Sequence, residues 1–168
     1  HSYSSAASDV YKRQAFTGLG APYWDASARG LLSGLTRDTG PKEIIRATIE
    51  SVAYQTYDLF EAMKNDGLKP KLIKVDGGMV LNNWFSQFLS DTINAKVLRP
   101  KVNETTGLGA AFMAGLQIGV YKSLKDIAKN WQADKTFSPK IKNTKRKILI
   151  EGWSKACLLY TSPSPRDQ

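Results

Sequence analysis

The stretch Leu72-Ile-Lys-Val-Asp-Gly-Gly-Met-Val-Leu-Asn82 decides the fold expected of this chain. Its first half is short and largely apolar, contains β-branched residues and follows Pro70, a combination typical of a buried strand. The pair Gly77-Gly78 then predicts a turn. Apolar residues recur at helical spacing beyond it, so the segment is predicted to run strand, glycine turn, helix. These apolar residues are Leu81, Trp84, Phe85, Phe88, Leu89 and Ile93.

A glycine turn between a strand and a helix is suited to bind a phosphate. The first N–H groups of a helix have no intrahelical partner, the helix dipole is positive there, and glycines carry no side chain. Asn82 is predicted at the start of the helix, where its amide can cap backbone groups or hydrogen-bond a nucleobase edge. An ordinary turn with an Asn cap fits the same spacing, because a lone glycine motif is weak evidence. Both interpretations remain open on spacing alone.

Upstream of this turn, residues 30–36 are predicted as a short strand, and a long helix follows. Pro41 fits the first helical position, with Gly40 or Thr39 as the cap. Gly67 is expected to end the helix. Apolar residues form one stripe along it and predict its buried face. The stripe consists of Ile45, Ile49, Val52, Ala53, Leu59, Phe60 and Met63.

Downstream of the turn, residues 95–99 are predicted as the next strand, ended by Pro100. Thr105 or Thr106 is then expected to cap a helix that runs to Gly115. Glycine inside a helix costs about 1 kcal/mol relative to alanine. We therefore expect the small residues of this helix to pack closely on a neighbouring element. Alternating helices and strands predict the α/β class.

Several stretches together resemble one known family. They are Phe16-Thr-Gly-Leu-Gly-Ala-Pro-Tyr-Trp-Asp25, Val75-Asp-Gly-Gly78, Asn82-Asn83, Arg99-Pro100 and Gly107-Leu-Gly-Ala-Ala111. In this order they resemble the C-terminal domain of the FGGY carbohydrate kinases, which belong to the actin-like ATPase (ribonuclease H-like) superfamily. The resemblance covers roughly residues 15 to 154, and the stretch from Phe16 to Asp25 points to the glycerol kinases within the family.

The resemblance implies a protein of two actin-like domains, with ATP and glycerol in the cleft between them. Phosphoryl transfer of this kind depends on positioning, on Mg²⁺ and on a carboxylate that accepts the hydroxyl proton. In the family the catalytic Asp, the glycerol ligands and the phosphate-binding Thr-Gly loops precede the stretch that begins at Phe16. We therefore expect this chain to be a fragment that lacks them and is inactive alone.

Three positions carry over from the resemblance as a nucleotide half-site. The backbone of Gly78 would approach the α-phosphate, Asn82 would help to hold the adenine end, and Gly77 would provide the turn geometry. No catalytic residue and no Mg²⁺ ligand is assigned. The longer protein is expected to be a cytoplasmic homo-oligomer that binds ATP and glycerol through both domains.

The two ends do not fit the family pattern. Residues 1–14 and 157–168 resemble translated sequencing adapters, so we expect them to be non-native or disordered, with the kinase domain over 15–156. The only cysteine is Cys157 and the only histidine is His1. A disulfide framework, a cysteine metal site and a histidine base are therefore excluded. No apolar run approaches the ~20 residues of a membrane span, and no secretion leader is indicated.

Two alternatives to a glycerol kinase domain remain open. One is a fragment of another FGGY sugar kinase, acting on a pentulose or hexulose. The other is a non-enzymatic basic domain, since the formal net charge is +9. The excess is concentrated in Lys135, Lys140, Lys142, Lys145, Arg146 and Lys147. Such a run is usually a solvated surface, and no aromatic interleaving favours nucleic acid here.

Individual acidic residues are weak candidates for a catalytic base. Asp25, Asp76 and Glu104 each fit a structural role, namely a loop hydrogen bond, a turn carboxylate and a residue near a helix N-terminus. No second carboxylate, histidine or lysine is spaced to partner any of them. Lys74 is expected to point outward from its strand into solvent.

Overall fold

The computed structural model describes residues 11–13 and 18–161. The chain divides into two compact units. The first comprises His1–Lys69, Asp91–Ile93 and Lys140–Gln168, and the second comprises Pro70–Ser90 and Asn94–Pro139. The predicted phosphate turn belongs to the second.

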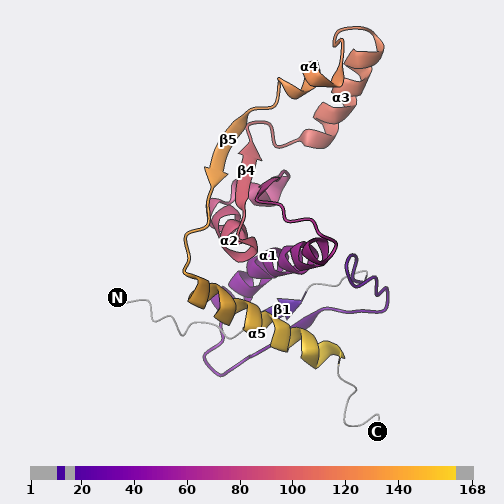
Figure 1. Ribbon diagram of the computed structural model, residues 1–168. Helices are drawn as coiled ribbons and strands as arrows, with labels where there is room; N and C mark the ends of the chain where they lie inside the picture. The colour runs from indigo at the N-terminus through magenta and orange to yellow at the C-terminus, as the bar shows by residue number, and fades with distance from the viewer. Residues whose placement is uncertain (1–10, 14–17, 162–168) are drawn as a thin grey trace. The chain divides into compact units, whose positions relative to one another are not determined.

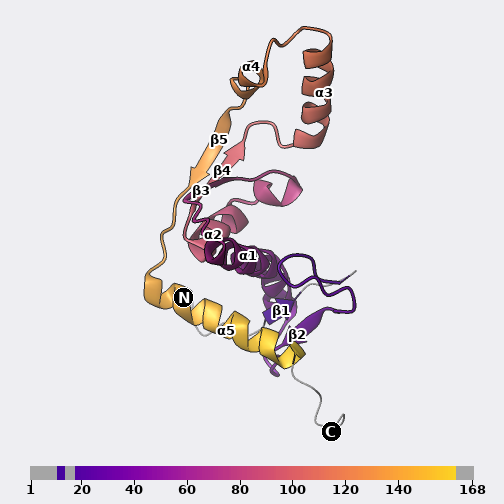
Figure 2. The same ribbon diagram turned by 45° about the vertical axis from the view of Figure 1, so that its right-hand side comes forward.

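In the first unit, strand β1 (Tyr11–Arg13) pairs antiparallel with β2 (Leu31–Ser33), with Tyr11 opposite Ser33. Helices α1 (Pro41–Asn65) and α5 (Asn143–Thr161) both contact β1. Figures 1 and 2 show β1 between the two helices. The strand predicted over residues 30–36 is confirmed over Leu31–Ser33 only, whereas the helix α5 was not predicted.

The predicted limits of α1 are confirmed. Gly40 is the N-cap and Pro41 is the first helical residue. The Gly40 N–H donates to the Glu43 carboxylate over 2.9 Å. Hydrogen bonds from the backbone N–H groups of Glu43 and Gly40 hold the pKa of the Glu43 carboxyl below its ordinary value. The chain leaves the helix through Gly67, whose φ of +86° favours glycine.

The predicted buried stripe of α1 is wrong in part, since four of its seven residues, Ile49, Val52, Phe60 and Met63, are half-buried. Ile45 is 59% exposed and Leu59 is 38% exposed, although Ala53 is buried as predicted. The buried residues are Ala47, Glu50, Ser51, Ala53 and Tyr54. The reason is α5, whose Trp153 stacks on Tyr54 with ring centroids 5.3 Å apart. Burial raises the pKa of the Tyr54 hydroxyl well above its ordinary value.

The second unit contains a sheet in the order β3 (Leu72–Lys74), β4 (Lys96–Pro100) and β5 (Ala133–Phe137). Strand β4 is parallel to β3 and antiparallel to β5. The two predicted strands are confirmed, but β5 was missed because its sequence, Ala-Asp-Lys-Thr-Phe, is mostly polar. Helix α2 (Asn83–Ile93) contributes much of the buried apolar surface. The buried apolar residues of this unit are Val80, Phe85, Phe88, Leu89, Ala95, Val97 and Phe137.

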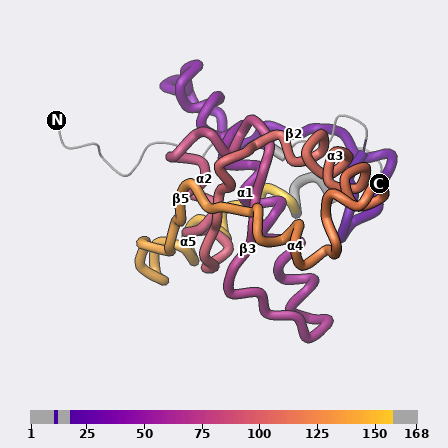
Figure 3. Tube along the Cα trace, turned by 90° about the horizontal axis from the view of Figure 1, so that it is seen from above, coloured from indigo at the N-terminus to yellow at the C-terminus, as the bar shows by residue number. Residues whose placement is uncertain are grey.

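Between β4 and β5 the chain forms α3 (Thr105–Gln117) and α4 (Leu124–Ala128). Figures 1 and 3 trace the chain through both helices before it returns along β5. The predicted cap of α3 is wrong by one residue, because Glu104 is the N-cap and its carboxylate accepts the Gly107 N–H over 3.3 Å. Thr105 already lies inside the helix, and its hydroxyl donates to the Asp76 carboxylate.

The close packing predicted for the small residues of α3 is confirmed at its end. A Cβ placed on Gly115 would lie 2.8 Å from the ring of Tyr121, and Gly115 is buried. A Cβ placed on Gly109 would meet no described heavy atom within 4 Å. The two glycines therefore differ in what they do, although the sequence alone treats them alike.

We expect Gly115→Ala to lower the stability of the chain and Gly109→Ala to raise it. Alanine is favoured over glycine in a helix by about 1 kcal/mol, and at Gly109 nothing described opposes that gain. At Gly115 the methyl group must displace the Tyr121 ring, which outweighs the gain. Urea unfolding followed by circular dichroism measures both. Equal shifts in the same direction would contradict this account of the packing.

Candidate functional site

The glycine turn leads into a short 3-10 helix, η1 (Gly78–Leu81), before α2 begins. Gly77 has φ +89° and ψ 174°, a conformation essentially reserved for glycine. A Cβ on Gly77 or on Gly78 would meet no described heavy atom within 4 Å, so the surface of the turn is open. The prediction missed η1 because a single 3-10 turn is too short to show a periodicity.

The turn is held from one side by the segment that links β4 to α3. The Gly77 N–H donates to the carbonyl oxygen of Asn103 over 3.3 Å. The Asp76 carboxylate accepts the hydroxyl of Thr105. These two bonds join the end of β3 to the start of α3, so the position of the turn depends on residues far along the chain.

Lys74 is exposed as predicted, and it also contacts an aromatic ring. Its ammonium nitrogen lies 3.8 Å from the centre of the Trp131 ring. A cation over an aromatic face is attracted by the ring quadrupole. Lys74 therefore packs on the segment that enters β5, beside the candidate site.

Asn82 lies between η1 and α2 and caps α2. Its Oδ1 accepts the N–H groups of Trp84 over 2.9 Å and Phe85 over 3.2 Å. Of the two roles left open by the sequence, capping is therefore observed. The prediction of unpaired N–H groups at the start of α2 is wrong for two of them, because the N–H groups of Trp84 and Phe85 donate to Asn82. The Nδ2 group of this exposed amide is the part that can reach a ligand.

Arg99 is a residue of this region that the sequence predicted only as part of a family motif. It is 9% exposed, and its guanidinium donates to the carbonyl oxygens of Val80 and Leu81. An arginine at the end of a predicted strand was the available signal. Its inward direction is not visible in the sequence.

The acidic candidates have structural partners. Asp25 accepts the N–H groups of Ser27 and Ala28 through Oδ1, as the loop interpretation predicts. The Asp76 carboxylate accepts the Thr105 hydroxyl, and the Glu104 carboxylate accepts the Gly107 N–H. Within residues 11–13 and 18–161, no three His, Cys, Asp or Glu side chains gather in a group able to hold a metal ion. Over the same residues, no helix has the length and apolar character needed to cross a membrane.

Residues 2–118 match the family model described as "FGGY family of carbohydrate kinases, C-terminal domain". The chain belongs to the FGGY family of carbohydrate kinases. It is 54% identical over 147 residues to glycerol kinase 1 of Pseudomonas aeruginosa, covering 88% of this chain and 30% of that protein. It is 49% identical to the glycerol kinase of Gluconobacter oxydans, covering 92% of this chain and 30% of that protein.

Solved structures give the same result for this FGGY domain. The glycerol kinase of Plasmodium falciparum with ADP matches with a TM-score of 0.80 and 34% identity, over 94% of this chain and 32% of that chain. A ligand-bound xylulose kinase from Lactobacillus acidophilus matches with a TM-score of 0.72 and 28% identity, over 90% of this chain and 30% of that chain. The predicted family and α/β fold are therefore confirmed. The chain spans about 30% of the length of these curated relatives.

The expectation for the ends of the FGGY domain falls mostly outside the described residues, which omit 1–10, 14–17 and 162–168. The family match itself begins at residue 2. Where these ends are described, Tyr11–Arg13 form β1 and α5 continues to Thr161. The boundaries at 15 and 156 remain a prediction.

Of the basic cluster of the FGGY domain, Lys135 is an exposed residue of β5, and the other five residues lie at or before the start of α5. Lys140, Lys142, Lys145 and Lys147 are exposed. Arg146 is half-buried and its guanidinium donates to the side chain of Asn143. These contacts fit the predicted solvated surface, and the arrangement itself indicates no particular ligand.

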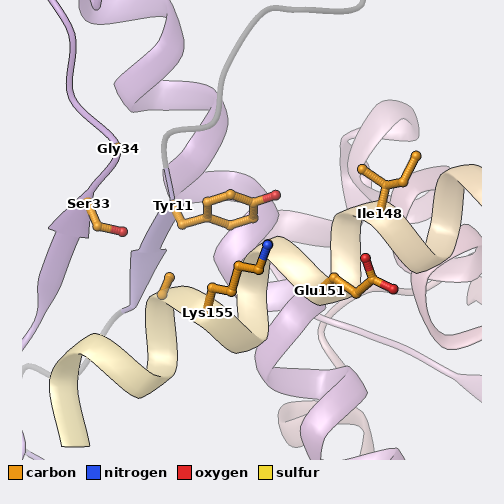
Figure 4. A pocket seen from close by; sticks show the side chains of 8 residues that line it. Tyr11, Ser33, Gly34, Ile148, Glu151 and Lys155 are labelled. Carbon is orange, nitrogen blue, oxygen red and sulfur yellow. The ribbon is translucent and has the colours of Figure 1, made fainter. Parts of the chain in front are cut away.

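A cavity of about 410 Å³ lies in the first unit, and no predicted site residue lines it. Figure 4 shows Tyr11, Ser33 and Lys155 around it. Its lining consists of Tyr11, Ser33, Gly34, Ile148, Glu151, Gly152, Lys155 and Ala156. The candidate nucleotide residues Gly77, Gly78 and Asn82 all belong to the second unit. The cavity is therefore a separate feature.

Proposed function

We propose that this chain is the C-terminal part of an ATP-dependent glycerol kinase, which converts glycerol to glycerol 3-phosphate, and that it supplies one side of the ATP site. The observation that carries the proposal is the 54% identity to glycerol kinase 1 of Pseudomonas aeruginosa. The match to the Plasmodium falciparum glycerol kinase with ADP supports the proposal that this chain binds an adenine nucleotide. The longer protein is further proposed to be a cytoplasmic homo-oligomer.

The proposed half-site consists of Gly77, Gly78 and Asn82. The positive φ of Gly77 bends the chain after β3, and the open side of Gly78 leaves room for the α-phosphate to meet the backbone. The Nδ2 group of Asn82 donates to an acceptor of the adenine end, while its Oδ1 stays in the cap of α2. One side chain thus fixes the helix and touches the ligand.

The chemistry assigned to this chain is binding and orientation of ATP. The carboxylate that takes the hydroxyl proton and the residues that hold glycerol are assigned to the rest of the longer protein. Mg²⁺ in kinase sites is held largely by substrate phosphates and a few carboxylates, and it neutralises charge on the transferred group. Within residues 11–13 and 18–161 no three His, Cys, Asp or Glu side chains gather in one group, and no Mg²⁺ ligand is assigned to this chain.

The chain alone is expected to show no ATP-dependent phosphorylation of glycerol. Activity should appear in a hybrid protein in which residues 15–156 replace the matching segment of the Pseudomonas aeruginosa enzyme. The measurement is glycerol 3-phosphate formation by purified protein. Turnover by the chain alone above the background of a heat-denatured sample would contradict the assignment of the catalytic residues to the missing part.

A second hybrid separates glycerol kinase from the other FGGY kinases. Here residues 15–156 replace the matching segment of the Lactobacillus acidophilus xylulose kinase, which is a structural neighbour at 28% identity. We expect this hybrid to phosphorylate xylulose far more slowly than the first hybrid phosphorylates glycerol, because its domain contacts are mismatched. The reverse order would favour a pentulose kinase as the parent.

A further inference from the structure

Arg99 lies at the centre of a buried hydrogen-bond network below the candidate site. It stands on β4 and is 9% exposed. Its Nη1 donates to the carbonyl oxygens of Val80 over 3.0 Å and Leu81 over 3.2 Å, and to Oδ1 of Asn83 over 3.1 Å. A buried guanidinium satisfied in this way is costly to replace, because its partners then lose a charged donor.

The acceptors of Arg99 stand on both sides of Asn82 in the chain. Val80 and Leu81 precede Asn82 and belong to η1, whereas Asn83 follows it as the first residue of α2. A single guanidinium nitrogen thus fixes the backbone before Asn82 and the side chain after it. The direction in which the Asn82 amide points is set by these contacts together with its own cap.

Asp134 on β5 fixes the orientation of the guanidinium. Its Oδ2 accepts from Nε of Arg99 over 2.8 Å and from Nη2 over 2.5 Å. Because guanidinium is planar, engaging Nε and Nη2 on one edge directs Nη1 toward η1. A lysine ammonium lacks this fixed fork and cannot reproduce both sets of bonds.

We propose that Arg99, oriented by Asp134, is a positioning residue for nucleotide binding, which holds Gly78 and Asn82 in place by bonding the residues around Asn82. The inference rests on the proposed function, since the half-site is what Arg99 positions. Arg99 donates to the protein and is not assigned a contact with the ligand.

The test uses the full chain and two measurements, hydrogen exchange and titration with ADP and Mg²⁺. In Arg99→Met the N–H groups of Trp84 and Phe85 should exchange at least about tenfold faster, because charge-assisted hydrogen bonds that hold η1 and Asn82 are lost. ADP should bind roughly tenfold more weakly. Arg99→Lys should restore little of either.

Two further variants keep the test decisive. Lys101→Met is the control, since Lys101 is an exposed cation near the same strand that bonds Gln132 and not η1. It should leave both readings unchanged. If Arg99→Met fails to fold, Asn83→Ala removes one of the three Nη1 acceptors and should give smaller changes of the same sign.

The outcomes separate the inference from the function it rests on. Faster exchange in Arg99→Met with unchanged ADP affinity would overturn the positioning role. Unchanged exchange in that variant would show that Arg99 does not hold η1 and the start of α2. Absence of ADP binding by the unaltered chain, even at millimolar ADP, would instead overturn the proposed half-site. In that case the exchange result still decides whether Arg99 holds η1.

Discussion

Gly78→Val is expected to weaken ATP binding by the glycerol kinase hybrid roughly a hundredfold, while thermal unfolding stays nearly unchanged. A branched side chain at this position occupies the space through which the phosphate would approach the backbone. We expect the fold to tolerate it, because a Cβ on Gly78 meets no described heavy atom within 4 Å and its φ is not positive. Gly77→Val is the informative contrast, since φ +89° makes any side chain there strained.

The role of Asn82 is separated from its cap by two substitutions. Asn82→Ala removes the cap of α2 and costs about 1 kcal/mol of stability in addition to the ligand contact. Asn82→Ser keeps an oxygen for the cap, so it should lose several-fold in ATP affinity at nearly constant stability. The Michaelis constant for glycerol should change little in each variant. Lys142→Ala is the surface control, and loss of ATP binding there with normal binding by Gly78→Val would make the basic segment the better candidate.

The sequence predicts those parts of the fold whose signals are local. The apolar run before Gly77, the glycine pair and Pro41 after Gly40 each specify a backbone conformation within a few residues, and the structure agrees. The N-cap of α3 was missed because threonine is a preferred N-cap residue and glutamate is not, which favoured Thr105. The longer side chain of Glu104 nevertheless accepts the Gly107 N–H. Thr105 is instead engaged by Asp76, a distant residue.

The parts that failed depend on partners far away in the sequence. The buried face of α1 includes Tyr54, because Trp153 of α5 stacks on it. The spacing of apolar residues along α1 gives no information about that distant partner. The direction of Arg99 depends in the same way on Asp134, which stands on a strand with mostly polar residues. The sequence therefore predicted the glycine turn of the candidate site. The contacts that support this turn from β4 and β5 are visible only in the structure.

Trp153→Ala is expected to destabilise the first unit by about 3 to 5 kcal/mol, the range for truncating a large buried aromatic side chain. Trp153 is 1% exposed and stacks on Tyr54 at an interplanar angle of 18°. Its indole Nε1 also donates to the carboxylate oxygens of Asp58 over 3.0 and 3.1 Å. Removing the ring opens a cavity beside Tyr54 and takes a donor from a carboxylate, and both effects act in the same direction.

Trp153→Phe keeps part of the aromatic ring and removes the donor. Phenylalanine lacks the N–H group and the smaller ring of the indole, so the expected loss is at least about 1.5 to 3 kcal/mol, the usual cost of a hydrogen bond to a charged group, and stays below that of Trp153→Ala. Ser154→Ala, at the next and exposed residue of α5, should change stability by less than about 0.5 kcal/mol. Urea unfolding of the three variants, followed by hydrogen exchange in α1, gives the comparison. If Trp153→Ala costs no more than Ser154→Ala, α5 does not pack on α1 through Trp153, and the buried face of α1 would be the apolar stripe that the sequence predicts.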